Sequence, residues 1–257
     1  EGPWLAFTGG RWLWPGVEVG RRVRVPDLNV TLETLSLRPL VLRVDGLLSE
    51  GECAHIRERA EPHMARSTVS HHDSDTNRPD TDWRTSDTYF LPSKGDPVIQ
   101  AIDERCAALT RTEVNQQELV QVLRYQEGAS YDAHTDYFAP ELYQKSPGTL
   151  SLIKNGARNR FATILWYLND VEGGGETVFP RAGGAPQPAS MRDCSKGLKV
   201  EPRLGSAVIF YSMRPDGALD PLSLHGACPV QKGLKWAANK WQWSGPMTFL
   251  PNPPRKA

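Results

Sequence analysis

The spacing of apolar residues predicts two helices in the first half of the chain. Ser49 and Glu52 form a Ser-x-x-Glu capping box, which marks the start of a helix. Asp96 followed by Pro97 is typical of the first turn of a second helix. The apolar residues of that helix fall on one stripe, made of Val98, Ile102, Cys106 and Leu109. We expect both helices to pack on the outside of a sheet.

Strand signals dominate the second half. Residues 119–125 (LVQVLRY) are rich in apolar and β-branched types, and Gly128 separates them from a further extended segment that starts at Tyr131. Residues 207–212 (AVIFYS) and the segment KWAANKWQW, which starts at residue 235, have the same character. The pattern predicts an α+β, strand-rich domain.

Length and charge narrow the class of protein. A chain of 257 residues can bury the core of a single such domain. Thirty basic and thirty acidic residues cancel, which argues against a nucleic-acid binder, because such proteins carry a basic excess or patch. No apolar run approaches the roughly 18 residues of a membrane span, so we expect none in this sequence.

The candidate chemistry lies in three residues, His134, Asp136 and His225. On a strand, residues i and i+2 point to the same face, so His134 and Asp136 can hold one ion together. His225 comes far downstream and must reach the ion from another strand of a closed or double-sheet β fold. Two imidazoles and one carboxylate on one side of a metal are the arrangement of non-haem Fe(II) oxygenases.

A His-x-Asp pattern alone is weak evidence, because most such residues in proteins are exposed or hydrogen-bonded for structural reasons. The strand-rich context, the distal His225 and a lysine that follows it strengthen the case. By contrast, His71 and His72 belong to a polar segment, residues 71–83, and we expect them to be solvated loop residues near the site.

Lys235 has a chemical reason to accompany the triad. A 2-oxoglutarate bound to iron through its 1-carboxylate and 2-oxo groups extends its 5-carboxylate inward, where a cation and hydroxyl donors would offset desolvation. Lys235, Thr163 and Tyr125 can supply these groups. The alternative for Lys235 is a solvated surface lysine, which is how we interpret Lys232 and Lys240.

Four long motifs occur in a fixed order along the chain. They are RTSDTYFL (84–91), QVLRYQEGASYDAHTDYF (121–138), FATILWYLNDVEGGGETVFP (161–180) and SMRPDGALDPLSLHGACPVQKGLKWAANKW (212–241). Together they resemble the prolyl 4-hydroxylases of plants and green algae, which are relatives of the catalytic domain of collagen prolyl 4-hydroxylase.

The resemblance implies a double-stranded β-helix core (jelly roll, cupin-like) with flanking N-terminal helices. It divides the chain into an N-terminal extension of unknown role (1–40), a catalytic domain (41–245) and a C-terminal tail (246–257). In this scheme the triad binds Fe(II), and Lys235 pairs with 2-oxoglutarate, assisted by Tyr125 and Thr163. The positions matching the peptide groove are Tyr131, Arg84 and Trp241, although the aromatic pair could equally be core residues and the arginine a loop-stabilising one.

The implied reaction is hydroxylation of peptidyl proline to 4-hydroxyproline in proline-rich or collagen-like sequences, with O2 as cosubstrate, succinate and CO2 as products and L-ascorbate as a supporting cofactor. Alternatives are a hydroxylase of another peptidyl or free amino acid, and a non-catalytic module that binds proline-rich peptides. An oxygen-sensing prolyl hydroxylase is disfavoured, because that subgroup usually has an arginine where this chain has Lys235. The sequence leaves the physiological peptide and the oligomeric state open.

One segment departs from the family pattern. Residues 141–159 form a longer connector than the family usually has, and loops of more than about a dozen residues are often lids or mobile segments. Substrate selection could therefore differ from that of the plant enzymes.

Four cysteines allow three pairings, and their spacing does not choose among them. By resemblance, Cys194 and Cys228 form a disulfide. Asn29 begins an Asn-Val-Thr glycosylation sequon. We therefore expect a protein of the endoplasmic reticulum or Golgi lumen, or of the secretory pathway, with a targeting or anchor segment that precedes Glu1.

Overall fold

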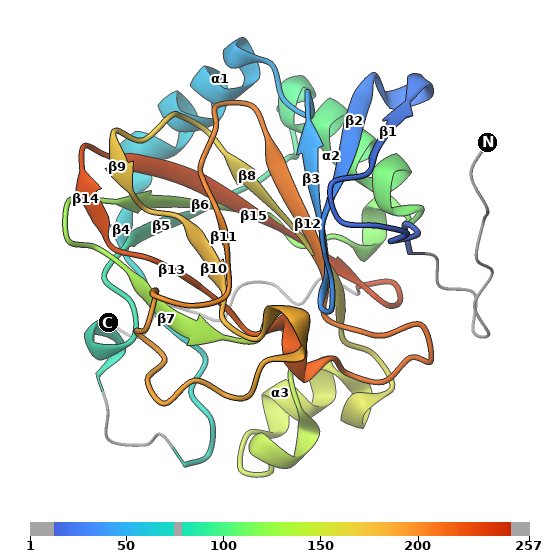
Figure 1. Cartoon of the computed structure of the whole chain (residues 1–257), viewed down its shortest axis with the longest axis vertical. Coiled ribbons are helices and arrows are strands. Elements are labelled where there is room, and N and C mark those ends of the chain that lie inside the picture. Colours follow the sequence, from blue (N-terminus) through green and yellow to red (C-terminus); the bar gives the residue numbers. More distant parts are fainter. Residues whose placement is uncertain (1–12, 75–78, 248–257) are drawn as a thin grey trace.

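Two facing antiparallel sheets form the core of the protein (Figure 1). The computed structural model describes residues 13–74 and 79–247. The large sheet has nine strands in the order β1 (Arg22–Val25), β2 (Val30–Leu37), β3 (Leu40–Asp45), β12 (Ala207–Tyr211), β8 (Arg160–Tyr167), β15 (Lys235–Trp243), β6 (Val120–Tyr125), β5 (Asp87–Leu91) and β4 (Ala65–Arg66). The small sheet has the order β11 (Leu198–Val200), β10 (Thr177–Phe179), β13 (His225–Ala227) and β7 (Tyr131–His134). A further pair joins β14 (Val230–Lys232) to β9 (Gly173–Gly174).

The strand β15 shows how one strand serves both faces of the large sheet. Successive side chains of a strand point to opposite faces. Trp236 and Ala238 belong to the apolar cluster that includes the helices, whereas Ala237 belongs to the cluster between the two sheets. The large sheet is thus buried on both sides, with helices on one face and the small sheet on the other. This confirms the α+β jelly-roll prediction.

Both predicted helices are present and lie against the large sheet (Figure 1). Helix α1 (Glu50–Ala60) begins with the capping box, in which the Ser49 hydroxyl accepts from the Glu52 N–H and the Glu52 carboxylate accepts from the Ser49 N–H. Helix α2 (Pro97–Thr110) begins at Asp96. Its buried stripe begins at Ile99, which is fully buried, and not at Val98, which we predicted and which is only partly buried.

The first forty residues are not a separate unit within the described part of the chain. Strands β1 and β2 extend the large sheet beyond β3. Trp14 is buried against the core, and its indole N–H donates to the carbonyl of Leu109 at 2.8 Å. The predicted boundary at residue 40 therefore has no structural counterpart there. Most of the predicted C-terminal tail lies outside the described residues.

The connector at residues 141–159 is not an irregular loop. It contains the 3-10 turns Pro140–Leu142 and Lys154–Gly156 and helix α3 (Pro147–Leu152). Tyr143 and Ile153 are buried and form a small satellite core with Phe138 and Trp243. The segment is an ordered helical insert with apolar packing of its own.

Lys240 corrects our interpretation of the lysines near the end of the chain. Its side chain is buried, its ammonium lies 2.6 Å from the carboxylate of Asp103, and it donates to the carbonyl of Glu118. We interpreted it as a surface lysine, but β15 is covered on both faces. Lys232 is exposed, as predicted.

The cysteine pairing is the one that the family resemblance implied. Cys194 and Cys228 form a disulfide, while Cys53 and Cys106 are free and buried on the two helices. Burial raises the pKa of the Cys53 thiol to about 11 and that of Cys106 to about 12, which makes both thiols unreactive at neutral pH. Among the described residues, no helix combines the length and the apolar character needed to cross a lipid bilayer.

Candidate metal centre and adjoining pocket

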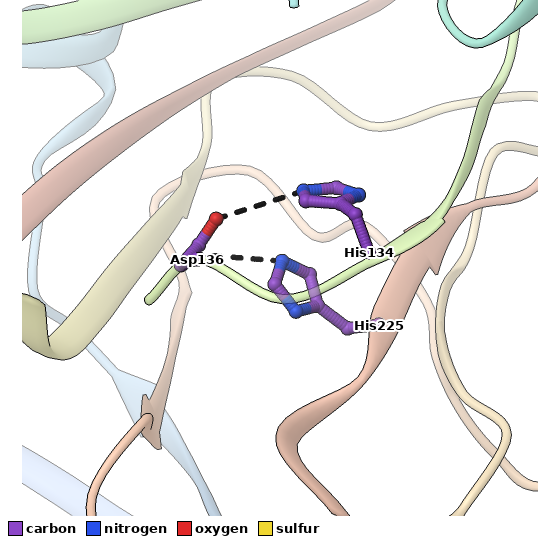
Figure 2. Close-up of side chains that lie close together, drawn as sticks. All are labelled: His134, Asp136 and His225. Atoms are coloured by element: carbon purple, nitrogen blue, oxygen red, sulfur yellow. Dashed lines mark ion pairs between the residues drawn. The ribbon is translucent and has the colours of Figure 1, made fainter. Parts of the chain in front are cut away.

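Two neighbouring strands of the small sheet bring the three predicted ligands together (Figure 2). His134 ends β7 and His225 begins β13, and the two residues lie directly opposite each other in the antiparallel register. Asp136 follows in a bend just past β7, so its carboxylate reaches the histidines by a turn of the backbone rather than by strand alternation. Each histidine Nε2 lies 3.6 Å from an oxygen of Asp136, and the possible ligand atoms all lie within 4.8 Å of one another.

Backbone carbonyls orient both imidazoles. Nδ1 of His134 lies 2.9 Å from the carbonyl of Asp132, and Nδ1 of His225 lies 2.9 Å from the carbonyl of Ser223. Because a carbonyl only accepts, each Nδ1 carries a hydrogen, and Nε2 is the ring nitrogen that faces Asp136. This is the tautomer that a metal ion requires.

The charge state of the triad also suits a metal. Burial lowers the pKa of His225 to about 4, which keeps its ring neutral. Burial works against ionisation of Asp136, but the adjacent His225 and His134 and the guanidinium of Arg160 hold its pKa below the usual range. A deprotonated carboxylate and neutral imidazoles are the ligand forms that bind a divalent cation.

Thr163 lies beside the metal site. Its hydroxyl donates to Asp136 Oδ2 at 2.5 Å, which fixes the rotamer of the carboxylate. The sequence pointed instead to a role near Lys235. That role stays a prediction, and the described contact makes Thr163 a positioning residue for Asp136.

Lys235 lies in an aromatic chamber between the sheets. Its side chain is 1% exposed, and Nζ donates to the carbonyl of Gly175 at 2.6 Å. The ammonium lies 5.2 Å from the ring centroid of Tyr125, its partner in the β15–β6 register, and 5.7 Å from that of Tyr167. No described carboxylate forms an ion pair with it, and burial lowers its pKa to about 8. The charge of Glu176 partly offsets that lowering of the pKa, although Glu176 forms no close ion pair with Lys235. A buried ammonium without a close ion pair among the described residues fits an anionic ligand such as the 5-carboxylate of 2-oxoglutarate.

The sequence analysis did not predict two residues that border this chamber, Tyr167 and Thr177. Tyr167 is buried near the ammonium of Lys235, and its hydroxyl donates to that of Thr177 at 2.8 Å. They come from different sheets, β8 and β10, so only the three-dimensional fold brings them to Lys235. A possible signal was the end of the apolar run FATILWYL, which places Tyr167 on the same face as Thr163.

A pocket of about 540 Å³ opens beside the triad. His134 and Asp136 line it, together with the three residues that we predicted for the peptide groove. Tyr131 stacks on the His134 ring with centroids 3.8 Å apart, and the guanidinium carbon of Arg84 lies 4.6 Å from the Tyr131 centroid. Trp241 lies across from them and is 5% exposed. All three therefore lie at the pocket wall, and their roles in substrate binding stay predictions.

Arg160 is a pocket residue that we missed. Its guanidinium lies 3.6 Å from the Trp241 centroid and forms paired hydrogen bonds to Glu118 at 2.6 and 2.9 Å. It also donates to the carbonyl of Asp136 at 3.3 Å. Its position as the first residue of a strand gave no hint of this, because an arginine there is usually solvated.

A jelly roll that carries a His-Asp-His triad and a buried lysine between its sheets is typical of the class of Fe(II)- and 2-oxoglutarate-dependent oxygenases. Residues 120–243 match the 2OG-Fe(II) oxygenase superfamily. The fold is similar to that of the viral collagen prolyl hydroxylase from Paramecium Bursaria Chlorella virus-1 in its 2-oxoglutarate complex, with a TM-score of 0.54 and 23% identity over 79% of this chain and 95% of that one.

Sequence relatives narrow the class to a family. The chain is 42% identical over 219 residues to probable prolyl 4-hydroxylase 3 of Arabidopsis thaliana, covering 83% of this chain and 72% of the relative. It is 40% identical over 215 residues to prolyl 4-hydroxylase 5 of the same plant, covering 82% and 70%. The chain belongs to the prolyl 4-hydroxylase family.

Proposed function

We propose that this protein hydroxylates peptidyl proline to 4-hydroxyproline with Fe(II), 2-oxoglutarate and O2. The observation that carries the proposal is the combination of three features between the sheets: the triad, the chamber around Lys235 and the aromatic pocket beside His134. A metal, an anionic cosubstrate and an extended peptide each have a place, and the family membership of the chain supports the same reaction.

His134, Asp136 and His225 would hold the iron through two Nε2 atoms and one carboxylate oxygen. When bound, the iron supplies the oxidising chemistry, in which one atom of O2 enters succinate and the other enters the hydroxylated peptide, with release of CO2. The chain's own residues orient the ligands before the metal arrives. The carbonyls of Asp132 and Ser223 and the hydroxyl of Thr163 perform that task.

Lys235 would bind the 5-carboxylate of 2-oxoglutarate. In its chamber the ammonium has one hydrogen-bond partner, the carbonyl of Gly175, and retains two N–H donors for a ligand. Tyr125 borders the same space. The surrounding apolar residues exclude water, which strengthens the pairing of opposite charges.

The pocket suits a proline-rich segment in an extended conformation. Polyproline II segments lose little conformational entropy on binding and pack on aromatic side chains. Tyr131, which stacks on a ligand histidine, and Trp241 would contact such a segment near the metal. Burial raises the pKa of the Tyr131 phenol to about 12, so it stays neutral and can donate a hydrogen bond to a peptide carbonyl.

We also propose L-ascorbate as a supporting reductant and the lumen of the secretory pathway as the location. The first rests on the resemblance alone. The second is supported by the disulfide between Cys194 and Cys228 and by the exposed position of Asn29 in its sequon.

Succinate formation tests the proposal. The protein would be incubated with Fe(II), 2-oxoglutarate and ascorbate, with and without poly-proline or a (Pro-Pro-Gly) repeat, followed by mass analysis of the peptide. We expect succinate that depends on peptide and a peptide that gains oxygen on proline. Succinate without any modified proline would overturn the substrate assignment, and no succinate from iron-loaded protein would overturn the enzyme assignment.

A further inference from the structure

The helical insert at residues 141–159 is fastened to the polar loop that precedes Trp83. Asp73 is the point of attachment. Its backbone N–H donates to the carbonyl of Leu142 at 2.9 Å, and its carboxylate accepts from the backbone N–H of Lys145 at 2.8 Å and from the Ser146 hydroxyl at 3.5 Å. One aspartate therefore joins two segments that are about seventy residues apart in the sequence.

A ring contact beside Asp73 places this junction at the pocket. His72 meets Tyr143 edge to face, with centroids 5.4 Å apart, and both residues line the pocket. Tyr143 is 4% exposed and packs against Phe138 with centroids 5.5 Å apart. Phe138 follows the ligand Asp136 by two residues, so the junction is continuous with the segment that carries the metal site.

The far end of the insert is anchored to that same segment. The side-chain amide of Asn159 accepts from the N–H of Phe138 at 2.9 Å and donates to its carbonyl at 2.7 Å. Ile153 and Trp243 complete the packing under the helix. The insert thus has a fixed base, and Asp73 ties the loop to that base.

We infer that Asp73 and the insert form a clasp that holds residues 68–73 as a preformed wall of the peptide pocket, and that His72 and Tyr143 on this wall help to select the peptide. The inference rests on the proposed function. A wall that is ordered before binding lowers the entropic cost of docking a substrate. His72 and Tyr143 line the pocket and Lys235 does not, so the clasp should act on the peptide and not on 2-oxoglutarate.

Asp73→Ala tests the clasp, because it removes both acceptors while leaving the insert's own packing intact. We expect the KM for a proline-rich peptide to rise about tenfold, the scale of a lost hydrogen bond to a charged group, with the KM for 2-oxoglutarate unchanged. Asp73→Asn should retain near-normal values, since its amide oxygen can accept from Lys145 and its NH2 can donate to Ser146. Asp216→Ala is the matched control, because Asp216 is an exposed aspartate that also accepts a backbone N–H and does not line the pocket.

Hydrogen exchange provides a readout that needs no turnover. In Asp73→Ala the backbone amides of residues 73 and 145 should exchange faster than in the wild type, and in the Asp216→Ala control they should not. Unchanged exchange would overturn the clasp. Faster exchange with an unchanged peptide KM would overturn its role in selection. If the wild-type protein hydroxylated no proline, the proposed function would fail, while the exchange experiment would still decide whether the clasp exists.

Discussion

The inner and outer ends of the site are built in different ways. At the inner end, Lys235 and Tyr125 face each other on paired strands, and His134 and His225 do the same in the small sheet. At the outer end the pocket wall combines strand residues such as Tyr131 and Trp241 with residues 68–72, Tyr143 and Met191, which lie outside regular strands. The comparison indicates that strands position the triad and Lys235, while connecting segments complete the pocket that we propose for the peptide.

The outer segments are nevertheless tied to the inner scaffold. Met191 accepts the N–H of Ala133 on β7 at 2.8 Å, and Arg192 forms an ion pair with Asp132 at 3.2 Å. The disulfide then connects Cys194 to Cys228, just after β13. Changes at the two ends should therefore have separable effects: large effects on iron or 2-oxoglutarate binding at the inner end, and smaller, peptide-specific effects at the outer end.

Removing a ligand should give the largest effect. His134→Ala and Asp136→Ala are expected to abolish turnover through loss of iron, because two ligands do not hold Fe(II) in competition with water. Iron content after gel filtration and succinate formation measure the two consequences. His63→Ala, which changes a histidine that does not line the pocket, is the control. Normal iron content and activity in either ligand variant would contradict the assignment of the triad.

Lys235→Ala should come next and act on one substrate only. We expect the KM for 2-oxoglutarate to rise on the order of a hundredfold, because the 5-carboxylate loses its buried charge partner. The peptide KM should change little, because Lys235 does not line the peptide pocket. Steady-state kinetics with each substrate varied in turn would show the difference, and an equal rise in both KM values would contradict the separation of the two ends.

The same lysine predicts a pH dependence. Burial lowers the pKa of Lys235 to about 8, so the free enzyme carries the ammonium below that pH and the neutral amine above it. The KM for 2-oxoglutarate should therefore rise as the pH increases through about 8, while bound 2-oxoglutarate shifts the transition upward by favouring the charged form. A 2-oxoglutarate KM that stays constant between pH 7 and pH 10 would contradict this role of Lys235.

The double variant Cys194→Ser with Cys228→Ser should give the smallest kinetic effect. It frees the segment around Met191 and should raise the peptide KM a few-fold, with the 2-oxoglutarate KM unchanged. For a separation of 34 residues, loss of the cross-link should lower the free energy of unfolding by about 3 to 4 kcal/mol. Thermal unfolding and peptide kinetics measure the two effects, and a variant with wild-type stability would show that the cross-link is not structural.

Much of the inner end could be predicted from the sequence because its residues are carried by strands with clear patterns. The three ligands converge, although Asp136 reaches the histidines from a bend rather than by strand alternation, and Lys235 is buried, as its apolar neighbours suggested. Tyr167 and Thr177 could not be placed near Lys235, since they converge only when the two sheets face each other. The alternating segment VTLETLSL of β2 was a readable strand signal that we did not use.

The structure of the outer end could not be predicted from local sequence patterns. The insert lacks a long apolar period, and its order comes from tertiary contacts such as Asn159 with Phe138. Lys240 was misread because its buried partner Asp103 lies on helix α2, and the local pattern does not show which strand that helix covers. Local periodicity reports which face is apolar, not which distant segment will cover it.

The most direct test of the account is hydroxylation of a (Pro-Pro-Gly) repeat under isotopically heavy O2. The account predicts that the heavy isotope appears both in hydroxyproline and in succinate, in proportion to each other, and only with Fe(II) and 2-oxoglutarate present. Heavy oxygen in succinate but in no proline of any peptide supplied would contradict the central claim that this pocket presents peptidyl proline to the metal.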